Sequence, residues 1–355
     1  MTFIKYFLCT ALIPLALFMA IGIYLEPLSG DLTRLGNVAE REWGWTAPQA
    51  VWAIKSNAVD AKADVIVIGD SFAIGNLWQS VAADMTGLTF VNYHWGDLGE
   101  DACLENGIAL LTQRYPQARY VMMESIERAF IDRFTAPQQK TPRCKNPIVS
   151  TALPGGGFTS ANRIPIASAG LLPDPIYALK ALKGLIKQRS LSSGLTDLGN
   201  AAIAPLARDH LFSNQASGAI LFLKEDLPKP GLSNAQLVLD SQQASEQASA
   251  LAVKLTQRGL TPIFLVIPNK LTTYSPYIQA EILTDHGPDI WPYLAHSGVH
   301  SIALKEAFQS EAAQELDFYL PNDTHLSSNG FRFFGTIVGD YLNGLKGQNP
   351  HEFMR

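Results

Sequence analysis

Apolar runs of strand length alternate with segments of helical periodicity over most of the chain. The runs are apolar throughout instead of at every second position, which is typical of parallel strands covered on both faces. Five of them are expected to be strands, the last being the weakest: residues 64–68, 88–93, 118–123, 262–267 and 299–304. Strand–helix–strand alternation predicts a doubly wound α/β fold with a mainly parallel sheet and right-handed crossovers.

Capping residues mark two of the helices between these strands. One is expected over residues 234–258, with Ser233 or Asn234 as its cap and Gly259 as its stop. Another follows the possible caps Ser328–Asn329. Its apolar positions recur at helical spacing: Phe331, Phe334, Val338 and Leu342.

Residues 135–232 break this rhythm, because they are rich in Pro, Gly, Ser and Ala. A structureless loop of that length is improbable in a compact domain, so we expect an insertion with some helix of its own near residues 176–188. It is either a lid or substrate platform over the sheet, or a decorative and partly mobile addition. The expected layout is an anchor at 1–25, a lead-in at 26–60 with a helix near 48–57, and a catalytic domain at 61–345.

The stretch from Phe7 to Leu25 carries no charge and is long enough to cross a bilayer as a helix. Lys5 precedes it and Glu26 follows it, which places the rest of the chain outside the cytoplasm under the positive-inside tendency. A cleaved signal peptide is the alternative. The absence of a convincing small-x-small cleavage site favours an uncleaved transmembrane anchor.

Composition narrows the classes of function. Of 355 residues, 47% are hydrophobic and 17% charged, which argues against disorder. The net charge is −5 and the sequence has no basic cluster, so nothing in it indicates a nucleic-acid-binding surface. No cysteine, histidine and carboxylate spacing suggests a metal site. Cys103 and Cys144 lie in the exported part, where they either form a disulfide or are two unrelated thiols.

Ser71 directly follows the first apolar strand, at the edge of the sheet where open α/β folds bind their ligands. Its backbone N–H lies near the start of the next helix, so it can donate to a developing oxyanion. A serine hydroxyl becomes a good nucleophile only when a base takes its proton. The alternative role for this serine is a helix N-cap.

His325 is the candidate base. Among seven histidines, only His325 has a carboxylate two residues before it, Asp323, and a Ser-rich helix start after it. Asp323 can accept from one ring nitrogen and leave the other facing Ser71, which predicts a Ser71–His325–Asp323 triad. The alternative is a surface loop in which Asp323 or Ser327 caps a helix.

Four segments around these residues resemble the SGNH (GDSL-like) hydrolase superfamily and, within it, the alginate O-acetyltransferase group (AlgX/AlgJ-like domains). They are Gly69–Phe72, Glu124–Arg128, Ile267–Lys270 with Tyr274, and Asp323–His325. The resemblance spans residues 60–345 apart from the insertion. The chain departs from that group in three ways: its Asp-Thr-His segment follows the Gly-Asp-Ser segment, Leu326 replaces the common Trp, and a Gly-x-Asn-Asp block is missing.

We expect the oxyanion to be bound by the backbone N–H groups of Ser71 and Gly96, the latter lying after the second strand. Arg128 is a further candidate donor, and its alternative role is a salt bridge with Glu124 or Glu127.

Lys270 and Tyr274 are expected to contact substrate or to have a structural role. His94 is expected to be a polar residue whose hydrogen bonds are satisfied within the protein, in preference to a second catalytic base.

The resemblance implies a three-layer α/β/α fold and O-acetylation of an exported polysaccharide through an acyl-enzyme at Ser71. The polysaccharide would be the acceptor, and a membrane-bound acyltransferase would present the acetyl donor on the periplasmic side of the inner membrane. No cofactor is implied. The same triad would equally serve a carbohydrate esterase or deacetylase. A non-catalytic polysaccharide-binding or assembly subunit is the alternative from a different class.

Overall fold

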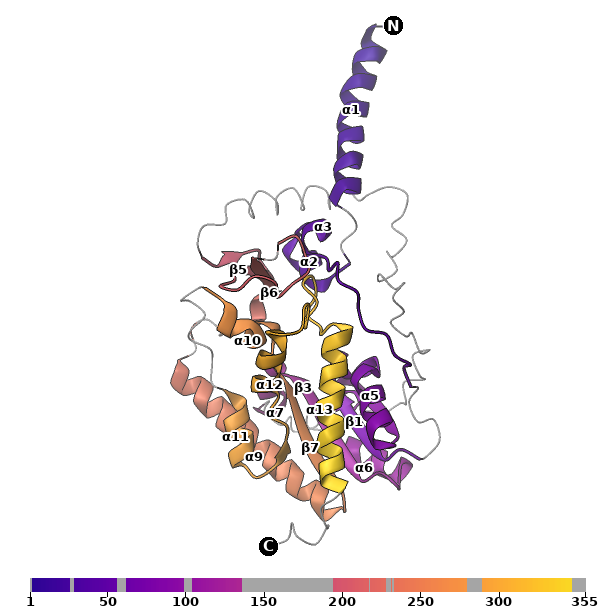
Figure 1. The fold of residues 1–355 in the computed structure, drawn as a ribbon, viewed down its shortest axis with the longest axis vertical. Helices are drawn as coiled ribbons and strands as arrows, with labels where there is room; N and C mark the ends of the chain where they lie inside the picture. Colours follow the sequence, from indigo (N-terminus) through magenta and orange to yellow (C-terminus); the bar gives the residue numbers. More distant parts are fainter. Residues whose placement is uncertain are drawn as a thin grey trace.

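The chain is described from a computed structural model over residues 2–25, 29–55, 62–98, 104–135, 194–216, 218–227, 231, 233–279 and 289–346. Cys103, Cys144 and the helix expected at 176–188 lie outside these residues. The centre of the fold is a five-stranded parallel sheet with the order β2-β1-β3-β7-β8 (Figure 1). Its strands are β1 (Val65–Gly69), β2 (Phe90–His94), β3 (Tyr120–Ile126), β7 (Thr261–Ile267) and β8 (His300–Ser301).

The five strands and the α/β class expected from the sequence are confirmed. Every residue of β1 is buried, with Val65 and Val67 in one hydrophobic core and Ile66 and Ile68 in the other. Apolar residues at successive positions therefore reflect burial on both faces of the sheet. β3 runs past its expected end, so Glu124 lies within the strand instead of after it.

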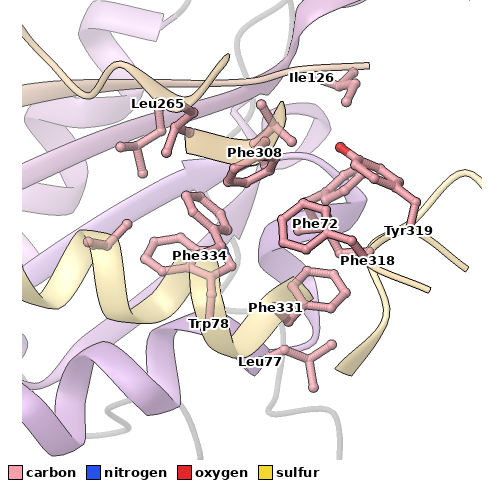
Figure 2. Packing of buried hydrophobic residues seen from close by; sticks show 14 of the residues in the cluster. Phe72, Leu77, Trp78, Ile126, Leu265, Phe308, Phe318, Tyr319, Phe331 and Phe334 are labelled. Atoms are coloured by element: carbon pink, nitrogen blue, oxygen red, sulfur yellow. The ribbon is translucent and has the colours of Figure 1, made fainter. Parts of the chain in front are cut away.

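Helices cover both faces, which gives three layers. One face carries α5 (Leu77–Thr86), α12 (Leu304–Ala312) and α13 (Ser328–Lys346). The other carries α6 (Leu104–Arg114), α7 (Glu127–Thr135), α9 (Asn234–Gln257) and α11 (Ile290–His296). Figure 1 shows α13 beside α5, and Figure 2 shows Phe334 of α13 against Trp78 of α5, whose ring centroids are 5.0 Å apart.

The helix caps follow the sequence in one case and differ in the other. Ser233 caps α9, since its side chain accepts from the Gln236 N–H, and Gly259 after the helix has a φ of +80°. At the start of α13 the Gly330 N–H donates to Ser327 Oγ at 3.2 Å. The cap of α13 is therefore Ser327 and not Ser328 or Asn329, because the helix begins one residue earlier than a cap at those positions allows.

The described end of the insertion is a small antiparallel sheet, with the order β4-β5-β6, which the sequence did not predict. The strands are β4 (Thr196–Asp197), β5 (Ala201–Pro205) and β6 (Ala219–Leu223), followed by a short 3₁₀ helix, η3 (Lys224–Asp226). One face of this sheet joins the core that contains α13, and the other packs on Leu32 and Trp43 of the lead-in. The small sheet at the end of the insertion thus forms a separate layer between the sheet domain and the lead-in.

The lead-in contains two short helices, α2 (Asp31–Gly36) and α3 (Glu40–Trp43). The helix expected at 48–57 is wrong for its described part, because residues 48–55 have no helical turn. Trp43 is only 1% exposed and fixes α3 to the small sheet. The backbone N–H of Lys55 donates to Ser80 Oγ and Trp52 Nε1 donates to Leu77 O, so this segment bonds to α5 instead of to itself.

The chain begins with α1 (Thr2–Leu25), which contains Pro14 and the exposed free thiol of Cys9. The described side chains of α1 are those of residues 3, 4 and 6–20. Within the described part of the chain, no helix has the length and apolar character needed to span a membrane. The membrane span expected over residues 7–25 is therefore not confirmed.

Candidate active site

Ser71 and His325 lie within hydrogen-bonding distance although 254 residues separate them in the chain. Ser71 is the first residue of α4 (Ser71–Ile74), directly after β1, and His325 lies in the loop between α12 and α13. The distance from His325 Nε2 to Ser71 Oγ is 2.7 Å, and that from His325 Nδ1 to Asp323 Oδ1 is also 2.7 Å. The three side chains therefore have the geometry of a serine–histidine–carboxylate triad.

The loop of residues 318–327, here called the histidine loop, is closed by its own backbone. Ser327 N donates to Phe318 O and Leu320 N to His325 O, both at 3.0 Å. Asp323 also accepts from the His325 backbone N–H at 3.0 Å, which fixes the carboxylate beside the ring. The loop thereby holds Asp323 and His325 in one orientation relative to the sheet.

The environment favours the ion pair that forms when the imidazole takes a proton. Burial opposes the ionised carboxylate of Asp323, but the hydrogen bond and charge of His325 outweigh it and lower the pKa of Asp323 to about 2. Burial likewise opposes the imidazolium of His325, but its hydrogen bond to Asp323 and the charges of Asp323, Asp31 and Asp70 outweigh burial and raise the pKa of His325 above the usual value. His325 is therefore a stronger base than an isolated histidine.

The turn that carries Ser71 is fastened to β3 through Asp70, which caps α4 in place of Ser71. Asp70 Oδ1 accepts from the Phe72 N–H at 3.1 Å, and Oδ2 accepts from the Ile126 N–H at 2.9 Å. The Asp70 N–H donates to Glu124 Oε2 at 2.9 Å. Because Asp70 supplies the cap, the Ser71 hydroxyl is left to face His325.

Two neighbours of this turn are part of the core. Burial and the charge of Asp70 raise the pKa of the fully buried Glu124 well above its usual value. The Phe72 ring packs between the loop and α13, 4.9 Å from the His325 ring centroid and 5.9 Å from that of Phe331 (Figure 2). The turn of residues 69–72, here called the nucleophile turn, thus shares a packed aromatic contact with the histidine loop.

Gly69 is required at the end of β1 by close packing. A Cβ at this position would lie 2.5 Å from Ala73 Cβ and in collision with Glu124 Oε2. We expect Gly69→Ala to destabilise the fold by about 1–3 kcal/mol through overpacking and to lower the reactivity of Ser71, because the turn must shift. Chemical denaturation and the rate of labelling by a serine-reactive probe measure the two effects.

Gly344→Ala in α13 is the matched control for this prediction, since nothing lies within 4 Å of its added Cβ. We expect it to leave stability unchanged or to raise it by up to about 1 kcal/mol. Equal behaviour of the two variants would contradict a packing role for Gly69.

The three expected oxyanion donors differ in what they bond. Among the described residues no acceptor takes the Ser71 N–H, which leaves it free to donate to an oxyanion. The Gly96 N–H donates to His94 Nδ1 at 3.0 Å, within the turn that follows β2. That bond shows His94 to be a satisfied polar residue and occupies the Gly96 donor.

Arg128 does form an ion pair, although not with the partners expected. Its Nη1 donates to Asp226 Oδ1 at 3.1 Å and to Asn269 Oδ1 at 3.2 Å, whereas Glu127 accepts from the Asn269 N–H. The partner Asp226 comes from η3, at the end of the insertion, which local sequence could not indicate. No hydrogen bond in the described part of the chain joins Arg128 to Ser71 or His325.

Lys270 and Tyr274 have structural positions under the histidine loop. Lys270 is 2% exposed, and its ammonium group donates to the carbonyl oxygens of Leu320, Pro321 and Asp323 at 2.7, 2.9 and 3.2 Å. Burial lowers the pKa of Lys270 to about 7. Tyr274 is fully buried and its hydroxyl accepts from the Tyr319 N–H. Of the two roles expected for them, burial favours the structural one over substrate contact.

Sequence reasoning missed two carboxylates of the lead-in, Asp31 and Glu40, which lie against the histidine loop. No sequence signal marked them, because Asp31 is 292 residues from its partner Asp323. Asp31, Asp323 and His325 place one potential ligand atom each within 4.8 Å of one another. His325 Nδ1 and Asp323 Oδ1 already bond each other, so we treat this group as part of the triad.

Comparison of the chain with models of known protein families, with curated proteins and with solved structures finds no match in any of the three. The functional argument therefore depends on the site itself.

Proposed function

We propose that this protein is an SGNH-type acyltransferase that O-acetylates an exported polysaccharide through an acyl-enzyme at Ser71. The 2.7 Å hydrogen bond between Ser71 Oγ and His325 Nε2, with Asp323 behind the ring, is the observation that supports it most. Gly69-Asp70-Ser71 follows β1 and Asp323-Thr324-His325 precedes the last helix, which is the order that the resemblance to ordinary SGNH hydrolases implies and not that of the alginate O-acetyltransferase group.

In the first half-reaction, Ser71 Oγ attacks the acyl carbonyl of the donor while His325 Nε2 takes the hydroxyl proton. The carbonyl oxygen becomes an oxyanion that the Ser71 N–H stabilises. When the tetrahedral intermediate collapses, the bond to the leaving group breaks and that group takes the proton from the imidazolium. The acetyl group is then an ester on Ser71, and His325 is neutral again.

In the second half-reaction, His325 takes the proton of a sugar hydroxyl, whose oxygen attacks the acetyl carbonyl. The bond to Ser71 Oγ breaks, and the serine regains its proton from the imidazolium. Ser71 is exposed at the rim of the sheet, which supports access by a polymeric acceptor. Water could replace the sugar, which would make the protein an esterase.

We infer that the domain works outside the cytoplasm with a membrane-bound acyltransferase as its donor partner. The uncharged run of residues 7–25, between Lys5 and Glu26, supports this placement. Protease treatment of spheroplasts tests it. Degradation of the domain in intact spheroplasts is expected, and protection until lysis would contradict it.

Incubation of the purified full chain with an activated acetyl ester and an oligosaccharide separates transfer from hydrolysis. Acetylated sugar, absent with Ser71→Ala, is the expected product. Release of acetate alone at every acceptor concentration would favour the esterase, and no turnover with intact folding would favour a non-catalytic subunit.

The raised pKa of His325 predicts the pH dependence of acylation. The base must be neutral, so activity is lost as pH falls through the pKa of His325, which lies above the usual 6.5. The acid limb of kcat/KM for ester cleavage is therefore expected above pH 6.5, and Asp323→Asn should move it down while slowing the reaction. His300→Gln, a change beside Tyr341, is the control and should leave the limb unmoved. A wild-type limb below pH 6.5 would contradict this.

A further inference from the structure

Residues 29–43 of the lead-in, here called the N-terminal clamp, pack on the histidine loop. The N–H groups of Leu32 and Thr33 donate to Asn322 O at 3.0 and 3.4 Å. Gly30 lies so close that a Cβ there would collide with the Asn322 backbone. Figure 1 shows α2 of this clamp near β5 and β6 of the small sheet, which it contacts.

The clamp binds the carboxylate oxygen of Asp323 that does not contact His325. Asp323 Oδ1 serves His325, whereas Asp323 Oδ2 accepts from the Asp31 backbone N–H at 3.1 Å. The Asp31 side chain approaches the same imidazole, with Oδ2 at 3.9 Å from His325 Nδ1. Asp31 therefore contacts the triad twice, once through its backbone and once through its charge.

Glu40 keeps Asp31 in this place. Its carboxylate is 8% exposed and accepts from Ser29 N at 3.0 Å, from Ser29 Oγ at 2.7 Å and from Thr33 Oγ1 at 2.7 Å. It also accepts from the Gly30 N–H and from the side-chain amide of Asn322. One buried carboxylate thus ties the turn before Asp31 to the residue before Asp323.

We propose that Asp31 is a positioning residue of the triad, whose backbone N–H orients Asp323 and whose carboxylate stabilises protonated His325. The catalytic consequence rests on the proposed function, whereas the effect on His325 does not. Among the described residues, the charged groups around the ring are Asp323 on the histidine loop, Asp31 and its ion-pair partner Arg34 on α2, Asp70 on the nucleophile turn, and Lys270 beneath Asp323.

The two charges on α2 should act on His325 in opposite directions. Asp31→Asn keeps the backbone N–H and the shape but removes the negative charge, so the pKa of His325 should fall by about 0.5 unit, because the partly exposed charge is screened. Arg34→Gln removes the counter-charge of Asp31, so the pKa of His325 should rise by a smaller amount. Asp84→Asn, in a surface ion pair with Lys55, should change nothing.

NMR titration of the histidine rings in the full chain tests this, with the His325 signal assigned by its loss in His325→Gln. A fall in Asp31→Asn and a rise in Arg34→Gln are expected, with matching shifts in the acid limb of Ser71 labelling by a fluorophosphonate. Unchanged titration in both variants, or shifts of the same sign, would overturn the role of Asp31. If Asp31→Asn does not fold, the direction of the change in the pKa of His325 in Arg34→Gln still tests the role of Asp31.

The two readouts separate this inference from the function on which it builds. Opposite NMR shifts without any Ser71 labelling would refute acyl transfer and keep the electrostatic role of Asp31. Ser71 labelling that depends on His325, without NMR shifts in either variant, would support the proposed enzyme and refute the positioning role of Asp31.

Discussion

Ser71→Ala and His325→Ala should each lower turnover of an activated acetyl ester by on the order of 10³-fold, and the double variant should be little worse than either. The reason is the direct hydrogen bond between the two side chains, 2.7 Å long, which makes them one working unit. Removing the hydroxyl leaves the base without a proton to take, and removing the base leaves the hydroxyl a weak nucleophile. Steady-state rates of the four proteins measure the coupling.

Ser249→Ala with His296→Ala provides the matched control, because both residues lie on helices of the opposite layer, α9 and α11. These variants should retain the wild-type rate singly and together. Losses at Ser71 and His325 that multiply in the double variant would argue that the two residues act independently.

The second large effect concerns Lys270, which holds three carbonyl groups of the histidine loop. Lys270→Met keeps most of the side-chain volume but removes the donor to all three carbonyls, of which Leu320 O keeps the bond from the Asp323 N–H. We expect it to destabilise the fold by about 3 kcal/mol or more. It should also slow Ser71 labelling, because Asp323 and His325 lose their support.

Lys254→Met is the control, since the Lys254 ammonium pairs with Glu105 at the surface and its side chain is 55% exposed. Its effect should stay within about 0.5 kcal/mol. Denaturant midpoints for the three proteins decide the comparison, and a Lys270→Met protein as stable as wild type would contradict the structural role.

The sheet and its helices could be predicted because their signals are local. Continuous apolar runs such as Val65–Gly69 indicate a strand with two covered faces, and Ser233 with Gly259 marks both ends of α9. The pairing of Ser71 with His325 could also be anticipated, since β1 ends at one rim and the loop before α13 returns to it. The doubly wound topology thus predicts which residues, distant in the sequence, meet at the same edge of the sheet.

Partners set by tertiary packing could not be predicted. Arg128 pairs with Asp226 of the insertion, which is distant in the sequence. Lys270 is buried under the histidine loop, and nothing in the sequence around Lys270 indicates that contact. The clamp shows the same limit, because no motif marks Asp31 or Glu40 in the lead-in. Only the folded arrangement assigns these charged residues to the site.

The most direct test is to treat the full-length protein with a fluorophosphonate and to locate the adduct by mass spectrometry. One adduct is expected, on the peptide that contains Ser71, absent in Ser71→Ala and formed at least about 100-fold more slowly in His325→Ala. No adduct on folded protein, or an adduct at another serine that Ser71→Ala leaves unchanged, would contradict a nucleophile at Ser71 activated by His325.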